Sequence, residues 1–381
     1  MQKKEIKYIG FYDVLDSNGI RACAMAAVNK MDYICDGISK AGFSVHLVSP
    51  SWFVASEKTI NYKGKSTLKL SESKKLTLAP SFSTSKKITG YFKIIFSLCW
   101  LFCWLLLNVK KNEKILVYHA PWLALPVLWA KKLKGFHLIL EVEEVYSDIS
   151  SIHSYFDRLE NKIVDKADSF LFSTELLAKR VNTNKPYIII YGNYKVYETL
   201  ALPPDDGKIH LVYAGIIDTD KAGAFNAIES ALYLPENYVM HIIGFGDIDT
   251  LQLRIAEINK TSKCKVSYDG LKKGDDFVKF CQSCHIGLST QKMDGDYLNS
   301  SFPSKILTYL GMGLNVVSCD VKCVSNSNIG KFISYYKIDH PKMIAGAIIK
   351  ANINNDGALS NLVKNLHYEF LFNLKKIMND L

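Results

Sequence analysis

Apolar residues in the first half of the chain fall into short runs that alternate with longer stretches of helical period. A run of four to eight apolar residues between polar residues or glycine predicts a strand, and apolar positions three or four residues apart predict a helix. The predicted strands are 6–12, 44–49, 114–118, 137–142 and 169–173. The predicted helices are 23–40, 94–109, 123–134 and 155–166. This alternation predicts α/β architecture with a doubly wound parallel sheet.

Polar residues and prolines between residues 192 and 208 interrupt this pattern and indicate an interdomain linker. The alternation then starts again, with predicted strands at 209–214, 239–243, 265–268 and 286–289 and predicted helices at 224–234, 249–260 and 275–281. We therefore predict one Rossmann-like domain over residues 1–195 and a second over residues 208–356. Residues 357–381 are predicted to form a C-terminal helix that packs back on the first domain.

The segment 302–318 combines a loop, a short helix and a buried strand. Pro303 favours the start of the helix, and Gly311 and Gly313 favour its end. In an open α/β sheet, the free N–H groups at such a helix start lie beside the carboxyl ends of the strands, where anions bind. Lys305, in the first turn, adds a positive charge that suits a diphosphate. The segment therefore predicts a binding site for an anionic ligand.

This segment resembles the donor-site element of GT-B glycosyltransferases, in particular the bacterial family 4-like enzymes. Two further stretches resemble elements of that family in the expected order, namely 213–215 with its following loop 218–223, and the turn 244–246. The resemblance implies two Rossmann-like domains facing a central cleft, with the nucleotide sugar held by the second domain. The residues that we assign to donor binding are Gly19, Gly215, Lys221, Gly244, Gly246, Asp296, Ser304, Lys305 and Thr308.

The sequence departs from the family pattern at two places. An isoleucine pair at 216–217 stands where the family commonly has an arginine, and Ser300 and Thr308 align with a pair of glutamates. We expect Thr308 to offer the ribose one neutral hydrogen bond, worth about 1 kcal/mol, in place of a charged one worth about 2 kcal/mol. Asp294 and Asp296 lie just upstream, and we expect these carboxylates to contact the donor sugar.

Residues that follow the strands of the first domain are candidates for the acceptor site. Gly19 follows the first predicted strand, His119 follows 114–118, and the acidic run 141–148 begins at the carboxyl end of the next strand. That acidic run resembles one seen in bacterial capsule and O-antigen transferases, and its alternative interpretation is a solvated loop. Carboxylates at a strand end can hydrogen-bond sugar hydroxyls or accept a proton. The candidate catalytic residues are therefore His119, Glu143, Glu144 and Asp294.

The net charge of +10 is partly concentrated between Lys63 and Lys93, where eight lysines accompany one acidic residue, Glu72. We expect this stretch to be a solvated loop or to lie on an anionic membrane surface, where each lysine contributes about 1 kcal/mol. The adjoining segment 94–109 has no charge, and its sixteen residues are fewer than the roughly 20 that cross a bilayer. It is either a buried helix or a helix lying in the membrane interface.

Nine cysteines without a signal peptide indicate a reducing compartment, so we expect a cytoplasmic protein, soluble or peripheral on the inner membrane. The pairs Cys281 with Cys284 and Cys319 with Cys323 have spacings that also occur in zinc sites. Small apolar cysteines are common in cores, so we assign no metal. The basic stretch lacks interleaved aromatic residues, which argues against nucleic-acid binding.

Together these features predict a glycosyltransferase that moves a sugar from a nucleotide-diphosphate sugar to a glycan or polyprenyl-linked glycan. The resemblance implies a role in bacterial surface polysaccharide synthesis, retention of anomeric configuration and no cofactor. Two alternatives remain open at this point. One is a membrane-associated scaffold subunit that binds nucleotide without turnover. The other is a nucleotide-sugar epimerase of the same fold, which would need carboxylate and histidine groups around the sugar that Ser300 and Thr308 do not supply.

Overall fold

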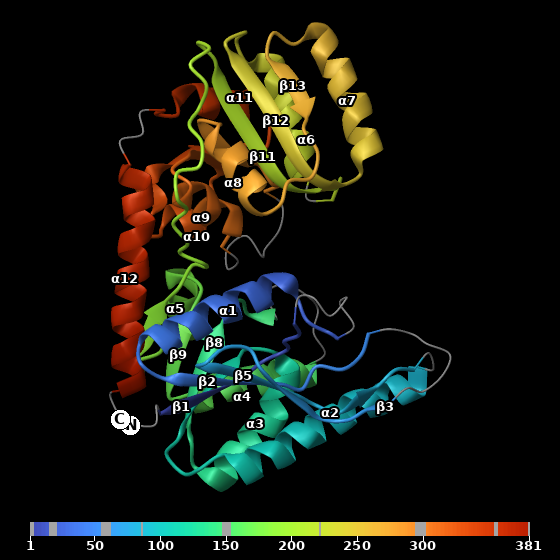
Figure 1. The fold of residues 1–381 in the computed structure, drawn as a ribbon, viewed down its shortest axis with the longest axis vertical. Coiled ribbons are helices and arrows are strands. Elements are labelled where there is room, and N and C mark those ends of the chain that lie inside the picture. Colours follow the sequence, from blue (N-terminus) through green and yellow to red (C-terminus); the bar gives the residue numbers. More distant parts are fainter. Residues whose placement is uncertain are drawn as a thin grey trace. The chain divides into compact units, whose positions relative to one another are not determined.

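The computed structural model describes residues 4–14, 21–54, 62–84, 87–146, 154–220, 222–293, 302–353 and 357–379. The chain divides into two compact units, whose elements are labelled in Figure 1. Unit 1 comprises Met1–Tyr191 together with Glu369–Leu381, and unit 2 comprises Gly192–Tyr368. The C-terminal helix α12 (Ala358–Asn379) thus begins in unit 2 and continues in unit 1.

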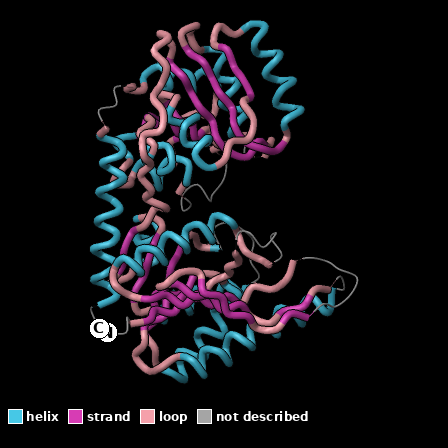
Figure 2. Tube along the Cα trace, in the orientation of Figure 1, coloured by secondary structure: helices cyan, strands magenta, loops and turns pink. Residues whose placement is uncertain are grey.

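Unit 1 is built on an eight-stranded sheet in the order β10-β9-β8-β7-β1-β2-β5-β4. The strands are β1 (Glu5–Ile9), β2 (Ser44–Ser49), β4 (Ser66–Lys69), β5 (Lys74–Leu78), β7 (Lys114–Tyr118), β8 (His137–Val142), β9 (Ser169–Phe172) and β10 (Tyr187–Ile189). Neighbouring strands are parallel except for the antiparallel pair β4–β5. A separate pair joins β3 (Tyr62–Lys63) to β6 (Ser81–Phe82). Figure 2 colours the strands of this sheet magenta and the helices of the unit cyan.

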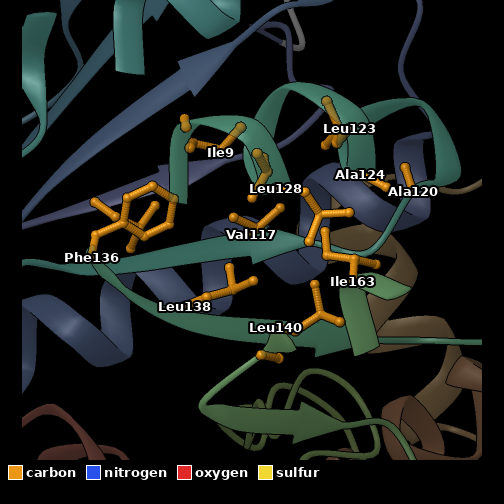
Figure 3. Close-up of a cluster of buried hydrophobic side chains, with 14 of the residues drawn as sticks. Ile9, Val117, Ala120, Leu123, Ala124, Leu128, Phe136, Leu138, Leu140 and Ile163 are labelled. Carbon is orange, nitrogen blue, oxygen red and sulfur yellow. The ribbon is translucent and has the colours of Figure 1, made fainter. Parts of the chain in front are cut away.

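Helices cover the sheet of unit 1 because its central strands are apolar on both faces. The helices are α1 (Met25–Lys40), α2 (Lys87–Asn108), α3 (Pro121–Lys134), α4 (Ser154–Lys166) and α5 (Glu175–Val181). Figure 3 shows one of the resulting cores, in which Val117 and Leu140 of the sheet lie beside Leu128 of α3 and Ile163 of α4. Each of these side chains is almost fully buried, so the sheet and both helices share one apolar cluster.

The lysine-rich stretch forms strands instead of the solvated loop that we expected. Its residues 74–78 make β5, which pairs in parallel with β2 and buries Leu76 and Leu78. The lysines on this strand are neutralised by unit 1 itself, since Lys74 Nζ lies 2.8 Å from Asp32 Oδ1 and Lys75 Nζ lies 2.6 Å from Glu5 Oε2. The two buried leucines occupy alternate positions, which is the pattern of a strand. Counting only the lysines overlooked this pattern.

Unit 2 has a six-stranded parallel sheet in the order β13-β12-β11-β14-β15-β16. The strands are β11 (Ile209–Ile217), β12 (Tyr238–Gly246), β13 (Lys265–Tyr268), β14 (Ile286–Ser289), β15 (Asn315–Cys319) and β16 (Ile333–Tyr336). The helices are α6 (Gly223–Ser230), α7 (Ile248–Thr261), α8 (Gly274–Gln282), α9 (Ser304–Gly311), α10 (Lys322–Ser325) and α11 (Pro341–Lys350). This is the Rossmann strand order, in which the connections reverse direction between β11 and β14.

The stretch 192–208 lies at the boundary between the units and contains no helix or strand. It is nevertheless hydrogen-bonded within unit 2, because the Tyr197 N–H donates to the Gly311 carbonyl at 3.0 Å. The Gln282 side chain accepts from the Leu200 N–H at 2.8 Å and donates to the Glu198 carbonyl at 2.9 Å. The polar and proline-rich composition therefore marks an irregular segment fastened to unit 2 and not a free linker.

Candidate functional site

The carboxyl edge of the unit 2 sheet brings two of the predicted donor residues together. Gly215 lies near the end of β11, and Lys305 lies in the first turn of α9, the helix reached from β14. A Cβ atom placed on Gly215 would lie 2.6 Å from Lys305 Nζ, so a larger residue here would displace the lysine ammonium from this position. Since β11 and β14 flank the topological switch point, this ammonium stands where open α/β sheets bind ligands.

Two tyrosines fix the position of the lysine. Lys305 Nζ lies 3.8 Å from the centre of the Tyr213 ring, a cation–π contact. The Tyr213 hydroxyl donates to the Ile216 carbonyl at 3.1 Å. Tyr309, one turn further along α9, is fully buried and accepts a hydrogen bond from the Ala214 N–H at 2.9 Å. Helix α9 is therefore attached to β11 through a buried hydroxyl, while its first turn stays at the sheet edge.

The sequence analysis did not identify Tyr213 as part of the site. The feature of the sequence that could have identified Tyr213 is its position on a strand, two residues before Gly215. Alternate residues of a strand point to one face of the sheet, so the ring of Tyr213 could have been predicted to lie beside the space left by Gly215.

Gly244 and Gly246 lie inside β12 and do not form the turn that we expected. Strand β11 also continues past its predicted end, and Gly215 and Ile217 pair with Gly244 and Gly246 in register. A Cβ atom on Gly244 would lie 1.8 Å from the Gly215 carbonyl oxygen, and one on Gly246 would lie 2.1 Å from the Ile217 carbonyl oxygen. Both glycines therefore allow two backbones to approach closely, which explains why strand pairing extends so far.

The start of α9 supplies N–H groups at the same edge. Pro303 precedes the helix in an extended conformation, and Ser304, its first residue, is exposed. The first N–H groups of any α-helix lack intrahelical acceptors and carry partial positive charge. The Thr308 hydroxyl donates to the Ser304 carbonyl at 3.2 Å, which leaves its oxygen lone pairs to accept from a ligand hydroxyl.

A second cation at this edge was also missed by the sequence analysis. Lys292 follows β14, and its Nζ lies 3.1 Å from the Thr219 carbonyl oxygen in the loop after β11. Lys292 therefore bridges the loops that leave the two switch-point strands, close to the end of the described segment. The predicted site residues Gly19, Lys221, Asp294 and Asp296 lie outside the described residues, as does Ser300.

The predicted catalytic histidine of unit 1 is buried. His119 follows β7, and its side chain is 1% exposed. Its Nδ1 lies 3.2 Å from the Glu144 carbonyl oxygen, and its Nε2 lies 3.3 Å from Glu160 Oε1. Burial lowers the pKa of His119 to about 4, so the ring is neutral at physiological pH. His119 is placed to hold the segment that carries Glu144 and not to touch a dissolved substrate.

The glutamates that follow β8 form a cluster with a lysine of α1. Lys30 Nζ donates to Glu143 Oε2 at 2.8 Å and to the Ile190 carbonyl at 2.8 Å. Glu141 is fully buried and accepts from the Tyr8 hydroxyl; burial, and secondly the Glu143 charge, raise its pKa to about 8. Burial and Glu143 also raise the pKa of Glu144, which is half-buried. The cluster can therefore hold a proton at neutral pH.

Glu143 and Glu144 thus lie together at a strand end, while Lys30 and Tyr8 were not predicted. Lys30 lies on a helix face and Tyr8 within a strand, where sequence pattern alone predicts packing. Their role arises from contacts between residues more than a hundred positions apart in the chain.

The cysteines with zinc-like spacing are core residues. Cys281, Cys284, Cys319 and Cys323 are all buried. Burial raises the pKa of Cys281 to about 12 and that of Cys319 to about 11, which disfavours the thiolate that binds metal. Within the described part of the chain, no three His, Cys, Asp or Glu residues are grouped so as to hold a metal ion.

Solved structures share the architecture of this chain at low sequence identity. The alpha,alpha-trehalose 6-phosphate synthase of Burkholderia multivorans is 9% identical with a TM-score of 0.64, covering 99% of this chain and 95% of that one. The pneumococcal O-GlcNAc transferase GtfA, solved with UDP and GlcNAc, is 11% identical with a TM-score of 0.62, covering 100% and 99%. A glycosyltransferase of Rickettsia africae ESF-5 is 12% identical with a TM-score of 0.61, covering 100% of both chains.

These neighbours are GT-B glycosyltransferases, and the chain has the GT-B fold with two Rossmann-like units. No protein-family model matches the chain, and no curated protein sequence matches it.

Proposed function

We propose that this protein transfers a sugar from a nucleotide-diphosphate sugar to a hydroxyl of a glycan or lipid-linked glycan. The observation that carries the proposal is the Lys305 ammonium, which lies against Gly215 at the switch point of the unit 2 sheet. A fixed cation beside a helix start suits the charge that grows on a leaving diphosphate. Fold neighbours support a uridine nucleotide, since one was solved with UDP and another is named as UDP-forming.

In this proposal, Lys305, the start of α9 and Lys221 bind the diphosphate, so that protein cations serve where other enzymes use a metal ion. Gly19 and Asp296 complete the donor contacts, and Asp294 contacts the donor sugar. The glutamate cluster of unit 1 binds the acceptor, and Glu143 and Glu144 hydrogen-bond its hydroxyls or take its proton. His119 maintains the position of Glu144.

The proposal extends to the setting of the reaction. We assign it to bacterial surface polysaccharide synthesis in the cytoplasm, with retention of anomeric configuration and no cofactor. Support for the retaining outcome comes from a fold neighbour, trehalose-6-phosphate synthase, which was studied for glycosyl transfer with retention.

The test begins with thermal unfolding of the wild type in the presence of a panel of nucleotide sugars. A donor at a hundred times its Kd should stabilise the protein by about 2.7 kcal/mol through mass action. The variant Lys305→Met keeps the hydrocarbon stem over Tyr213 and removes the charge. It should lose most of this shift and, in assays of nucleoside diphosphate release with acceptor, roughly a hundredfold in rate.

The matched control is Lys260→Met, because Lys260 is exposed in the last turn of α7, at the opposite edge of the sheet. This variant should behave as the wild type. A shift that survives in Lys305→Met would remove Lys305 from the donor site. Donor binding without any release of nucleoside diphosphate would contradict catalysis and favour a scaffold subunit.

A further inference from the structure

Helix α2 of unit 1 is apolar on both of its faces. Its inner stripe includes Leu101, Trp104 and Leu105, which are buried in the core of the unit. Its outer stripe should be polar in an ordinary surface helix, because that face meets water. Instead, the exposed positions on α2 include Phe92, Ile95 and Leu107, of which Phe92 is 63% exposed and Leu107 is 84% exposed.

Helix α3 extends this apolar surface. The two helices pack against each other, and the Phe102 ring of α2 lies 6.1 Å from the Trp129 ring of α3 in an edge-to-face contact. Trp129 and Leu133, one turn apart on α3, are 56% and 66% exposed. We call this continuous surface the α2–α3 face. Contiguous exposed apolar surface of this kind marks a site of interaction with a protein or a membrane.

The charged residues on α2 and α3 have one sign. No acidic residue occurs between Ser73 and Asn112, nor within α3. Lys110, Lys111 and Lys132 are exposed at the ends of the two helices. A membrane interface with anionic lipids is complementary to both the apolar surface and the positive charges. Apolar and aromatic side chains enter the headgroup region, while lysines approach the lipid phosphates.

Helix α2 is attached to unit 1 by hydrogen bonds as well as by its buried side chains. Ser97 Oγ donates to the Pro50 carbonyl, and Lys93 Nζ donates to the Phe53 carbonyl. Among the described residues, the one helix long and apolar enough to cross a membrane is Ile88–Asn108, and 28% of its apolar stretch is buried. Insertion across a bilayer would extract Leu101 and Leu105 from the core, whereas docking on the surface covers only the outer stripe.

We propose that the α2–α3 face docks unit 1 onto a bilayer that contains anionic phospholipid. The proposal concerns a binding surface and does not depend on the glycosyl transfer argued above. Its test therefore uses no donor, no acceptor and no turnover.

The experiment is flotation of the full chain with vesicles of phosphatidylcholine alone and with vesicles of equal parts phosphatidylcholine and phosphatidylglycerol. The wild type should float with the anionic vesicles, and high salt should weaken the binding. The double variant Phe92→Ser/Trp129→Ser should bind these vesicles at least about tenfold more weakly, because two aromatic side chains no longer enter the interface.

The matched control removes two exposed apolar side chains from elsewhere. Phe372 on α12 is 72% exposed and Leu253 on α7 is 71% exposed. The variant Phe372→Ser/Leu253→Ser should float as the wild type does. The triple variant Lys110→Glu/Lys111→Glu/Lys132→Glu should bind the anionic vesicles more weakly and lose the salt dependence. Far-ultraviolet circular dichroism should show all variants folded, since every substituted side chain is exposed.

A second readout locates the contact. Cys99 and Cys103 are exposed on α2, whereas the other described cysteines are buried except for the partly exposed Cys23. A polarity-sensitive maleimide attached in a Cys23→Ser background should report an apolar environment when anionic vesicles are added. Absence of wild-type flotation, or equal flotation of the two double variants, would overturn the proposal. So would a wild-type dimer that Phe92→Ser/Trp129→Ser converts to a monomer, because the face would then join two copies of the chain.

Discussion

At the scale of single residues, burial decides the charge of the groups that follow the strands of unit 1. Glu141 lies on β8 and His119 follows the neighbouring parallel strand β7, yet burial moves their pKa values in opposite directions, because it disfavours the charged form of each. Both side chains are consequently neutral near pH 7. The Glu143 charge, held by Lys30, adds to the upward shift of Glu141.

This arrangement predicts a pH dependence of stability. The folded protein holds the Glu141 proton up to about pH 8, whereas the unfolded chain loses it near pH 4.5, so stability contributed by this group falls as pH rises. His119 acts in the opposite sense below pH 6.5, where the unfolded chain gains a proton. Between pH 6.5 and 8, Glu141 should therefore lower the unfolding free energy by up to about 1.4 kcal/mol per pH unit.

Urea unfolding of wild type and Glu141→Gln across this pH range measures the effect. The amide keeps an acceptor for the Tyr8 hydroxyl but cannot titrate, so its profile should be flatter. The control Glu369→Gln removes an exposed carboxyl on α12 and should reproduce the wild-type profile. Parallel profiles for wild type and Glu141→Gln would show that Glu141 is ionised in the folded protein.

The glycines of unit 2 give a second prediction, in which alanine substitutions at two positions change stability in opposite directions. Gly244→Ala should destabilise the protein by roughly 1–3 kcal/mol, because its Cβ meets the Gly215 carbonyl and its φ is +148°. Gly346→Ala should stabilise it by about 0.5–1 kcal/mol, since Gly346 lies inside α11 with no atom near its Cβ position. Chemical denaturation measures both. A neutral Gly244→Ala would contradict the close approach of β11 and β12.

At the scale of elements, α12 shows how one helix serves a core distant in sequence. Phe370 is 2% exposed and lies 5.4 Å from the Tyr33 ring in a stacked contact. It also covers Gly37 of α1, where a Cβ atom would lie 2.8 Å from the Phe370 ring. Lys114 Nζ, at the start of β7, donates to the Ile377 carbonyl at 2.7 Å. The second half of α12 therefore completes unit 1.

Two phenylalanines that are two positions apart on α12, and so lie on different faces of the helix, test this role. Phe370→Ala should cost roughly 3–5 kcal/mol, because it leaves a cavity in the core of unit 1. Phe372→Ala removes the same side chain from an exposed position and should change stability by less than about 0.5 kcal/mol. Similar unfolding midpoints for the two variants would mean that α12 does not pack on α1 in solution.

At the scale of the whole molecule, the two units differ in how the chain builds them. Unit 2 is one continuous segment, whereas unit 1 needs residues from both ends of the chain. Each unit has its own sheet and its own buried side chains. A continuous segment with its own core should fold independently.

We therefore predict that the isolated segment 192–368 unfolds cooperatively and keeps the part of nucleotide binding that depends on Lys305, since Gly215, Tyr213 and Lys305 all lie within it. Residues 1–191 alone should be less stable than unit 1 in the full chain, and a peptide of residues 358–379 should restore stability. Calorimetric titration with the best donor measures nucleotide binding by segment 192–368, and thermal unfolding measures the stability of residues 1–191 with and without the peptide. A segment 192–368 that stays unfolded would contradict the independence of unit 2.

The sequence by itself determined the class of the fold and the position of the helix start at residues 303–305. Apolar runs such as 44–49 and 286–289 became strands with the predicted bounds, because periodicity reports burial on one or both faces of an element. The proline–lysine–glycine pattern of 302–318 likewise predicted a helix start at a sheet edge, since these residues act through local backbone geometry.

Only the tertiary structure decided what surrounds those residues. The gap at Gly215 that Lys305 fills, the ring of Tyr213 beneath it and the pairing of Gly244 with Gly215 all join segments separated along the chain. The same holds for the pairing of Lys30 with Glu143, the burial of His119 and the strand formed by the lysine-rich stretch. Burial, charge pairing and close backbone approach depend on which residues meet in space, and periodicity along one segment carries no information about its partners.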